Sequence, residues 1–120
     1  MRLFNFEKLQ VWQKSKDLVI DIYQVTKYFP KEELYGLTSQ LRRASISVSS
    51  NLAEGTSRKT GKDKAYFTTM AYSSLMETMN QLIISYELAY LPEKEYFNFR
   101  TKIEEIGRML NALRNSQENS

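Results

Sequence analysis

The sequence contains no cysteine and no histidine among its 120 residues. Without thiolate or imidazole ligands, the chain lacks the groups that build most structural zinc sites, haem sites and iron–sulfur clusters. Disulfides, Ser-His-Asp triads and Cys-His dyads are excluded for the same reason. We therefore expect no metal and no cofactor, and a fold whose stability comes from packing alone.

Long apolar runs are also missing from the sequence. No stretch approaches the roughly 20 apolar residues that a membrane-spanning helix needs, and the opening residues Met-Arg-Leu-Phe-Asn-Phe-Glu lack the pattern of a signal peptide. The sequence therefore predicts a cytoplasmic protein with no membrane partner. Its length fits one domain, and 42% hydrophobic residues can supply a single core.

Glycine and proline are scarce, with only four and two residues in the chain. Both residues are unfavourable inside helices, so their positions mark breaks between helical segments. Pro30 and Gly36 bracket one connection, Gly55 and Gly61 bracket a second, and Pro92 marks a third. The breaks divide the chain into four segments.

Each segment repeats apolar residues at intervals of three and four, which is the spacing of an amphipathic helix. We predict helices at about residues 6–28, 37–54, 61–90 and 93–113, followed by a frayed tail at 115–120. Asn5 is a candidate cap of the first helix, and Thr60 with Asp63 forms a candidate capping box for the third. Short connections make neighbouring helices antiparallel. The predicted fold class is all-α, an antiparallel up-down-up-down four-helix bundle.

The charge of the chain is unevenly distributed, although its net value of +3 is too small to identify a nucleic-acid-binding protein. Residues 42–64 contain six basic and two acidic residues, a net charge of +4, which leaves the rest of the chain at −1. Tyr66 and Phe67 follow directly, and aromatic residues beside cations are typical of nucleic-acid surfaces. The candidate nucleic-acid-binding residues are Arg42, Arg43, Arg58, Lys59, Lys62 and Lys64.

Two other readings of this region are weaker. The segment from Gly55 to Lys62 resembles a phosphate-binding loop, but it has one residue too many between the glycines, and Asp63 replaces the required Ser or Thr.

Glu54 and Glu77 lie among apolar or small residues, and we expect them to pair with Arg42, Arg43 or Arg58 at helix ends or across an interface. No nucleophile accompanies either acid, so no catalytic residue is assigned.

Some apolar residues exceed what a four-helix bundle needs to bury. The first helix is apolar over a wide arc, and Ile46 lies off the apolar stripe of the second helix. Surplus apolar surface indicates self-association. The candidate oligomer-interface residues are Val11, Leu18, Val25 and Ile46.

Several sequence blocks resemble one known family. They are Phe-Glu-Lys-Leu-Gln-Val-Trp-Gln at 6–13, Phe-Pro at 29–30, Tyr-Gly-Leu-Thr-Ser-Gln-Leu-Arg-Arg-Ala at 35–44 and Ser-Asn-Leu-Ala-Glu-Gly at 50–55. Together they make the chain similar to the 23S rRNA-intervening sequence protein family, encoded within bacterial large-subunit ribosomal RNA genes. The resemblance implies an antiparallel four-helix bundle that assembles as a ring-like homopentamer, with no established enzymatic activity.

The resemblance also has one departure and one implication for binding. The family often has Pro where this chain has Ser49, and we expect a serine to bend the second helix only mildly. Related members include the accessory protein of diversity-generating retroelements, a basic barrel thought to bind nucleic acid and a reverse transcriptase.

The leading hypothesis is a non-enzymatic homo-oligomeric bundle that binds RNA or DNA through the six basic residues. The alternative is a protein–protein interaction scaffold or accessory protein without nucleic-acid affinity. A third reading, an enzyme that uses Glu54 or Glu77, requires a pocket that shifts the pKa of one of these acids.

Overall fold

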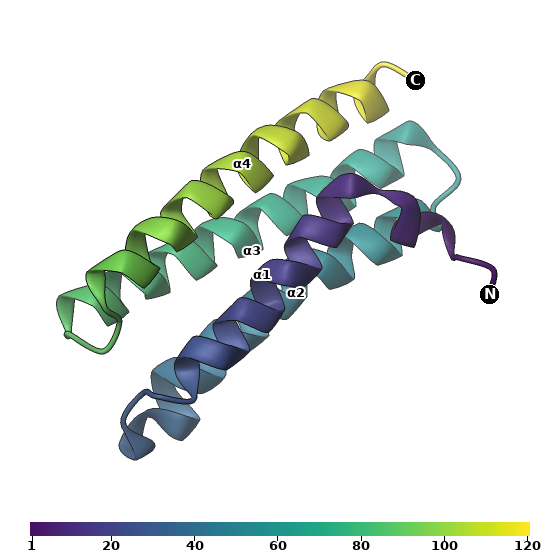
Figure 1. The fold of residues 1–120 in the computed structure, drawn as a ribbon. Helices are drawn as coiled ribbons and strands as arrows, with labels where there is room; N and C mark the ends of the chain where they lie inside the picture. Colours follow the sequence, from purple (N-terminus) through teal and green to yellow (C-terminus); the bar gives the residue numbers. More distant parts are fainter.

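Four α-helices connected by short turns make up the structure, a computed structural model that describes all of residues 1–120 (Figure 1). They are α1 (Gln10–Thr26), α2 (Ser39–Thr56), α3 (Gly61–Glu87) and α4 (Glu93–Glu118). The chain has no strand; the shorter elements are 3₁₀ turns η1 (Asn5–Lys8) and η2 (Lys31–Glu33) and the π-helical turn η3 (Leu34–Thr38). The prediction of an all-α helical bundle is confirmed.

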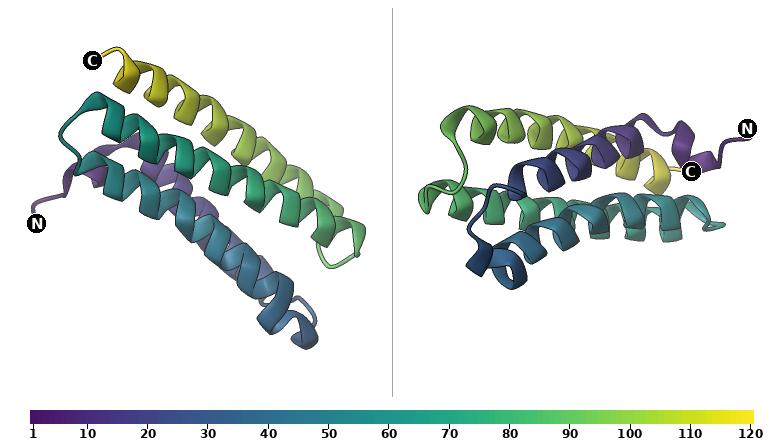
Figure 2. Two further views of the ribbon diagram at one scale, coloured as in Figure 1. Left: turned by 180° about the vertical axis from the view of Figure 1, so that it is seen from behind. Right: turned by 60° about the horizontal axis from the view of Figure 1, so that its bottom comes forward.

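The helices form an elongated bundle with extents of 45 × 29 × 21 Å. Contacts are most extensive between α2 and α3 and between α3 and α4, and they are sparse between α1 and α4. Figures 1 and 2 show the α1–α2 and α3–α4 hairpins diverging toward the end that holds η2, η3 and the α3–α4 turn. We call this end the open end, and we call the opposite end, with the α2–α3 turn and both termini, the closed end.

All four helices contribute to one hydrophobic core. Its largest fully buried side chains are those of Leu18, Ile22, Leu41, Val48, Leu75, Leu82, Leu91, Ile106 and Leu110. Apart from Leu91, which lies in the α3–α4 turn, they recur at four or seven residues along each helix, and this spacing turns them toward a common axis. The core is therefore the feature that the sequence periodicity predicts best.

The beginning of the chain differs from the prediction. Residues 5–8 form a 3₁₀ turn, so α1 starts at Gln10 rather than near residue 6, and Asn5 does not cap it. The residue before α1 is Leu9, and no side chain caps this helix; Oε1 of Glu7 accepts a hydrogen bond from the Phe4 amide at 2.9 Å and closes the preceding turn η1. The closing turn of the helix includes Thr26, whose hydroxyl donates to the Ile22 carbonyl at 2.7 Å.

The connection from α1 to α2 depends on Gly36. This residue has φ −114° and ψ −113°, which interrupts the helical backbone inside η3. A Cβ atom there would lie 2.8 Å from Oε1 of Glu33, which already accepts the Leu37 amide at 3.2 Å. Glycine is thus required for this carboxylate to cap the turn.

The end of α3 also differs from the predicted limit at residue 90. Ala89 has φ 64°, in the left-handed region, and it ends the helix after Glu87. The amide of Ala89 donates to the Tyr86 carbonyl and that of Tyr90 to the Ser85 carbonyl, both at 2.9 Å. This is the hydrogen-bond pattern of a Schellman cap, with alanine where glycine is usual.

The predicted frayed tail is wrong. Helix α4 continues to Glu118 because its last turn packs on the start of α3. The Thr68 hydroxyl donates to Oε1 of Gln117 at 2.6 Å, and Gly61 leaves space for the Gln117 backbone. A polar contact, which an apolar pattern does not reveal, therefore orders these residues.

Candidate nucleic-acid interface

The α2–α3 turn, at the closed end, is built by hydroxyl side chains and one close helix contact. The hydroxyls of Thr56 and Ser57 donate to the carbonyls of Ala53 and Glu54 at 2.8 and 2.6 Å. The Thr60 hydroxyl then accepts the Asp63 amide at 3.1 Å, which confirms Thr60 as the cap of α3. These bonds satisfy backbone groups that helix ends leave free, so the turn is short and defined.

Gly55 allows α2 and α3 to meet directly before this turn. A Cβ atom on Gly55 would lie 2.8 Å from Cβ of Phe67 and 3.6 Å from the Lys64 carbonyl oxygen. The phosphate-binding loop that this segment resembles is absent, because the segment joins two helices and no strand precedes it.

Four of the six candidate cations gather at this turn. Arg58, Lys59 and Lys62 are exposed and Lys64 is half-buried, and none of them belongs to the three ion pairs of the chain. We call these four residues the turn cations. Because none of them is held in an ion pair, these side chains can meet an anion from solvent.

An aromatic pair lies beside the turn cations. The Arg58 guanidinium carbon is 4.5 Å from the centre of the Phe67 ring, and the Tyr66 ring meets the Phe67 ring edge-on at 5.4 Å between centres. Tyr66 is 60% exposed, so its ring is open to an incoming planar group. Arg58 held over an aromatic face and a free tyrosine together offer both charge and stacking.

The other two candidate cations lie elsewhere. Arg42 donates from Nε to the Thr26 hydroxyl at 3.0 Å, and its guanidinium carbon is 4.5 Å from the centre of the Tyr23 ring. Arg42 therefore ties α2 to α1. Arg43 is exposed on another face of α2, about 20 Å from Arg58 at a helical rise of 1.5 Å per residue.

The expected pairing of the two glutamates within the chain is wrong. Glu54 and Glu77 are both exposed, and neither forms an ion pair. Glu77 and Arg43 line one shallow depression of about 500 Å³ between α2 and α3, but their charged atoms do not meet. Arg42 and Arg58 turn instead toward aromatic rings. No group of three or more acidic side chains is placed to hold a metal ion.

The structure also corrects the candidate oligomer interface. Val11 and Leu18 are 5% and 1% exposed and belong to the core of the protomer, so they present no surface to a second copy. Much of the apolar arc of α1 is buried, because this helix packs on α2 and, less extensively, on α4, whereas Ile20 is 49% exposed. Val25 is half-buried against the core, and Ile46 is 39% exposed.

Sequence reasoning missed exposed apolar residues of α3. Met70 and Ile84 are 41% and 42% exposed, and Met76 and Ile83 are exposed to a similar extent. Met70 and Ile84 lie two heptads apart, and Met76 and Ile83 lie one heptad apart. Each pair therefore forms a row on the helix that is separate from the main apolar stripe of the third segment. These extra rows are the signal that could have identified them.

Ser49, which stands where the resembling family often has proline, has only a local effect on the second helix. Ser49 lies inside a continuous α2, and its hydroxyl donates to the Ile46 carbonyl at 3.0 Å. None of the four helices combines the length and the apolar character that spanning a lipid bilayer requires.

Comparison with known proteins gives a family and a fold. Residues 7–112 match the family model described as 23S rRNA-intervening sequence protein. A crystal structure from Bacteroides thetaiotaomicron, described as a protein with unknown function from the S23 ribosomal protein family, is similar with a TM-score of 0.78. The sequences are 19% identical, and the similarity covers 87% of this chain and 97% of the other. A search of curated proteins found no match.

Proposed function

The chain belongs to the 23S rRNA-intervening sequence protein family, and from this premise we propose that it is a non-enzymatic, self-associating bundle that binds RNA or DNA in the cytoplasm. One observation carries the proposal: the four turn cations are free of ion pairs and lie beside exposed Tyr66. Unpaired cations attract the phosphate backbone, and an aromatic ring stacks on bases of any sequence.

Self-association strengthens this surface. The family resemblance favours a homopentamer, and exposed Ile46, Met70 and Ile84 give the protomer apolar area to bury. Repetition of the turn cations around a ring sums their fields, so the assembly attracts a polyanion more strongly than one protomer does. Arg42 and Arg43 serve different roles, the first within the protomer and the second on a separate face.

Salt dependence of binding tests the proposal. Affinity for a generic RNA or duplex DNA should fall with salt, with a log–log slope of about −0.9 for each duplex phosphate contacted. Changing Arg58, Lys59 and Lys62 together to Ser should flatten the slope by about two to three per engaged protomer, because fewer counterions are released.

A matched control uses three exposed lysines near the open end. Lys27, Lys31 and Lys94 changed together to Ser alter the net charge equally but leave the turn cations intact. If both triple variants flatten the slope equally, binding follows overall charge rather than this surface. If only the control flattens it, the binding site lies at the open end.

The second candidate function is a protein-interaction scaffold without nucleic-acid affinity. The exposed apolar rows on α3 favour it, since such side chains are typical of protein contacts. Absence of measurable nucleic-acid binding at about 50 mM salt, where the electrostatic contribution is strong, would support the scaffold instead.

A further inference from the structure

Residues of α1, α4 and the α3–α4 turn line a groove toward the open end. The two hairpins diverge at this end (Figure 1). Its volume is about 470 Å³, which lies within the range of small-molecule sites. Val25, Pro92 and Phe99 supply apolar surface, and Tyr28 and Tyr90 supply two further aromatic rings. A compact organic body can therefore lie against carbon atoms on several sides of this groove.

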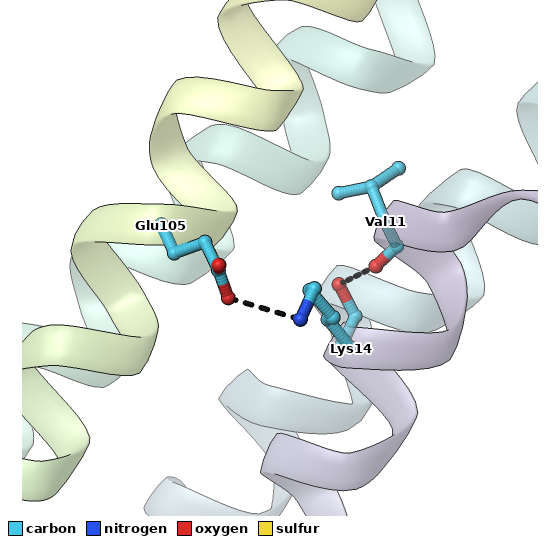
Figure 3. Close-up of polar contacts among 4 residues, drawn as sticks. Val11, Lys14 and Glu105 are labelled. Atoms are coloured by element: carbon cyan, nitrogen blue, oxygen red, sulfur yellow. Dashed lines mark hydrogen bonds and ion pairs between the residues drawn. The ribbon is translucent and has the colours of Figure 1, made fainter.

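Two ion pairs span the surface between α1 and α4, two helices that make few contacts with each other. Lys14 Nζ lies 3.1 Å from Glu105 Oε1 (Figure 3), and Lys102 Nζ lies 2.6 Å from Asp21 Oδ2. All four side chains are partly exposed, so these ion pairs lie at the surface of the α1–α4 interface, which we call the seam. The groove begins at the second bridge.

The charges in the groove favour a cation. Asp21 and Glu95 bring two carboxylates against the one ammonium of Lys102, and Lys102 is already paired with Asp21. Glu95 is in no ion pair. A further carboxylate, that of Glu33, accepts the Tyr90 hydroxyl at 3.1 Å. Desolvation raises the pKa of the Tyr90 phenol, and the hydrogen bond to Glu33 and the charges of Glu33 and Glu32 raise it further.

The chain already places one ammonium group in this setting. Lys102 Nζ is 5.8 Å from the centre of the Phe99 ring while it pairs with Asp21, so carboxylate and aromatic face hold the same cation. Aromatic rings attract ammonium and guanidinium groups through their electron-rich faces. Glu95, Tyr28 and Tyr90 offer the same combination without an internal cation.

We propose that this groove binds a small organic cation, an ammonium or guanidinium group on an apolar or aromatic body. The charged group lies toward Glu95, and the body covers Val25 and Phe99 between the two tyrosines. This site is separate from the turn cations, which lie at the closed end and attract the opposite charge.

The probe for this site is 2-phenylethylammonium, and its neutral counterpart is 2-phenylethanol. Titration of the isotopically labelled full chain, followed by NMR, uses the side-chain amides of Gln24 and Asn98 as reporters within the groove. We expect saturable shifts at these amides with a Kd near or below about 1 mM, the range open to so small a ligand. The alcohol should bind at least about fivefold more weakly, because a charge facing a carboxylate adds to the shared apolar contact.

Matched variants assign the charge to one residue. Glu95→Gln should weaken ammonium binding about fivefold and leave alcohol binding unchanged, since it removes only the carboxylate charge. Glu104→Gln, also on α4 but lining the α3–α4 face, should change neither. Tyr28→Ala should weaken both ligands, and because Tyr28 is almost fully exposed, this variant keeps the core intact.

Three results would overturn the proposal. The first is equal affinity for the ammonium and the alcohol, and the second is equal effects of Glu95→Gln and Glu104→Gln. The third is no saturable shift at Gln24 or Asn98 up to about 10 mM ligand, a concentration well above the Kd expected for a ligand of this size. None of these results bears on nucleic-acid binding at the closed end, so the two proposals fail independently.

Discussion

The α2–α3 and α1–α4 interfaces show two ways of joining helices within one bundle. Small residues bring α2 and α3 together: Gly55 admits Phe67, and the hydroxyls of Ser47 and Ser74 share a hydrogen bond of 2.8 Å. Long lysines and acids instead bridge α1 and α4. Because side-chain size sets the distance between helix axes, α2 and α3 meet directly at Gly55, whereas α1 and α4 make sparse contacts and leave a groove at the open end.

The two interfaces have different consequences for the surface of the bundle. Close packing of α2 on α3 fixes the backbone that presents the turn cations. The bridged seam leaves side chains of α1 and α4 accessible at the open end. Small residues at the α2–α3 interface thus give the turn cations a fixed backbone, and long residues at the α1–α4 interface leave a groove accessible.

The largest effect should follow from filling the close interface. Gly55→Val places carbon atoms where Phe67 lies, so we expect the free energy of unfolding to fall by about 1–3 kcal/mol. Chemical denaturation followed by circular dichroism measures the change. Ala53→Val, at a half-buried position two residues earlier, is the control and should cost less. Equal losses would mean that α2 and α3 tolerate greater separation than the comparison implies.

A stabilising change is expected at the open end. Ala89 has φ 64°, which costs a residue with a Cβ about 1–2 kcal/mol, so Ala89→Gly should raise the free energy of unfolding by about 1 kcal/mol. Ala112→Gly, at an exposed position inside α4, should lower it by about 0.5–1 kcal/mol. Thermal unfolding distinguishes the two signs. A loss of stability in both variants would contradict the backbone strain assigned to Ala89.

Removing the bridges should have a smaller effect. Lys14→Met and Lys102→Met each delete one partly exposed ion pair, worth about 0.2–1 kcal/mol at low salt. The difference from the wild type should shrink in about 1 M salt, where exposed charges are screened. Lys94→Met, which breaks no ion pair, is the control. A loss comparable to that of Gly55→Val would show that the seam is essential to the fold.

The smallest effect concerns pH at the open end. The pKa of Tyr90 lies above its usual value of 10.0 in the folded chain. The protonated phenol therefore contributes stability below the unfolded pKa, and this contribution is lost as pH rises through the folded pKa. Tyr90→Phe should make the free energy of unfolding less sensitive to pH above about 10, whereas Tyr28→Phe should not. Identical pH dependence in the wild type and Tyr90→Phe would contradict this assignment.

Helix positions could be predicted from the sequence because apolar spacing directly determines the buried face. Several helix ends could not, among them the ends of α3 and α4. Ala89 closes α3 in a conformation that usually signals itself by glycine, and Gln117 orders the last turn of α4 through a polar contact with Thr68. Both depend on backbone geometry or on residues distant in sequence, which local periodicity does not carry.

The candidate site could be predicted only in composition. Arg42 and Arg43 are adjacent in sequence, yet neighbouring residues on a helix point about 100° apart, so one meets α1 and the other faces solvent. The turn cations escape this ambiguity because a short turn keeps them at one end. Val11 and Leu18 show the same limit, since an apolar residue does not reveal whether its partner is a neighbouring helix or another copy.

Because the bundle has an even number of antiparallel helices, both ends of the chain lie at the same end of the molecule, which affects how the protein can be tagged. Both chain termini lie at the closed end, beside the α2–α3 turn (Figure 1). A purification tag or fluorescent protein attached to either terminus would stand next to Arg58 and Lys62, where a basic or acidic tag would imitate or mask their charge. A single cysteine introduced at Leu88, which is half exposed in the α3–α4 turn of a chain without cysteine, offers a labelling position remote from that surface.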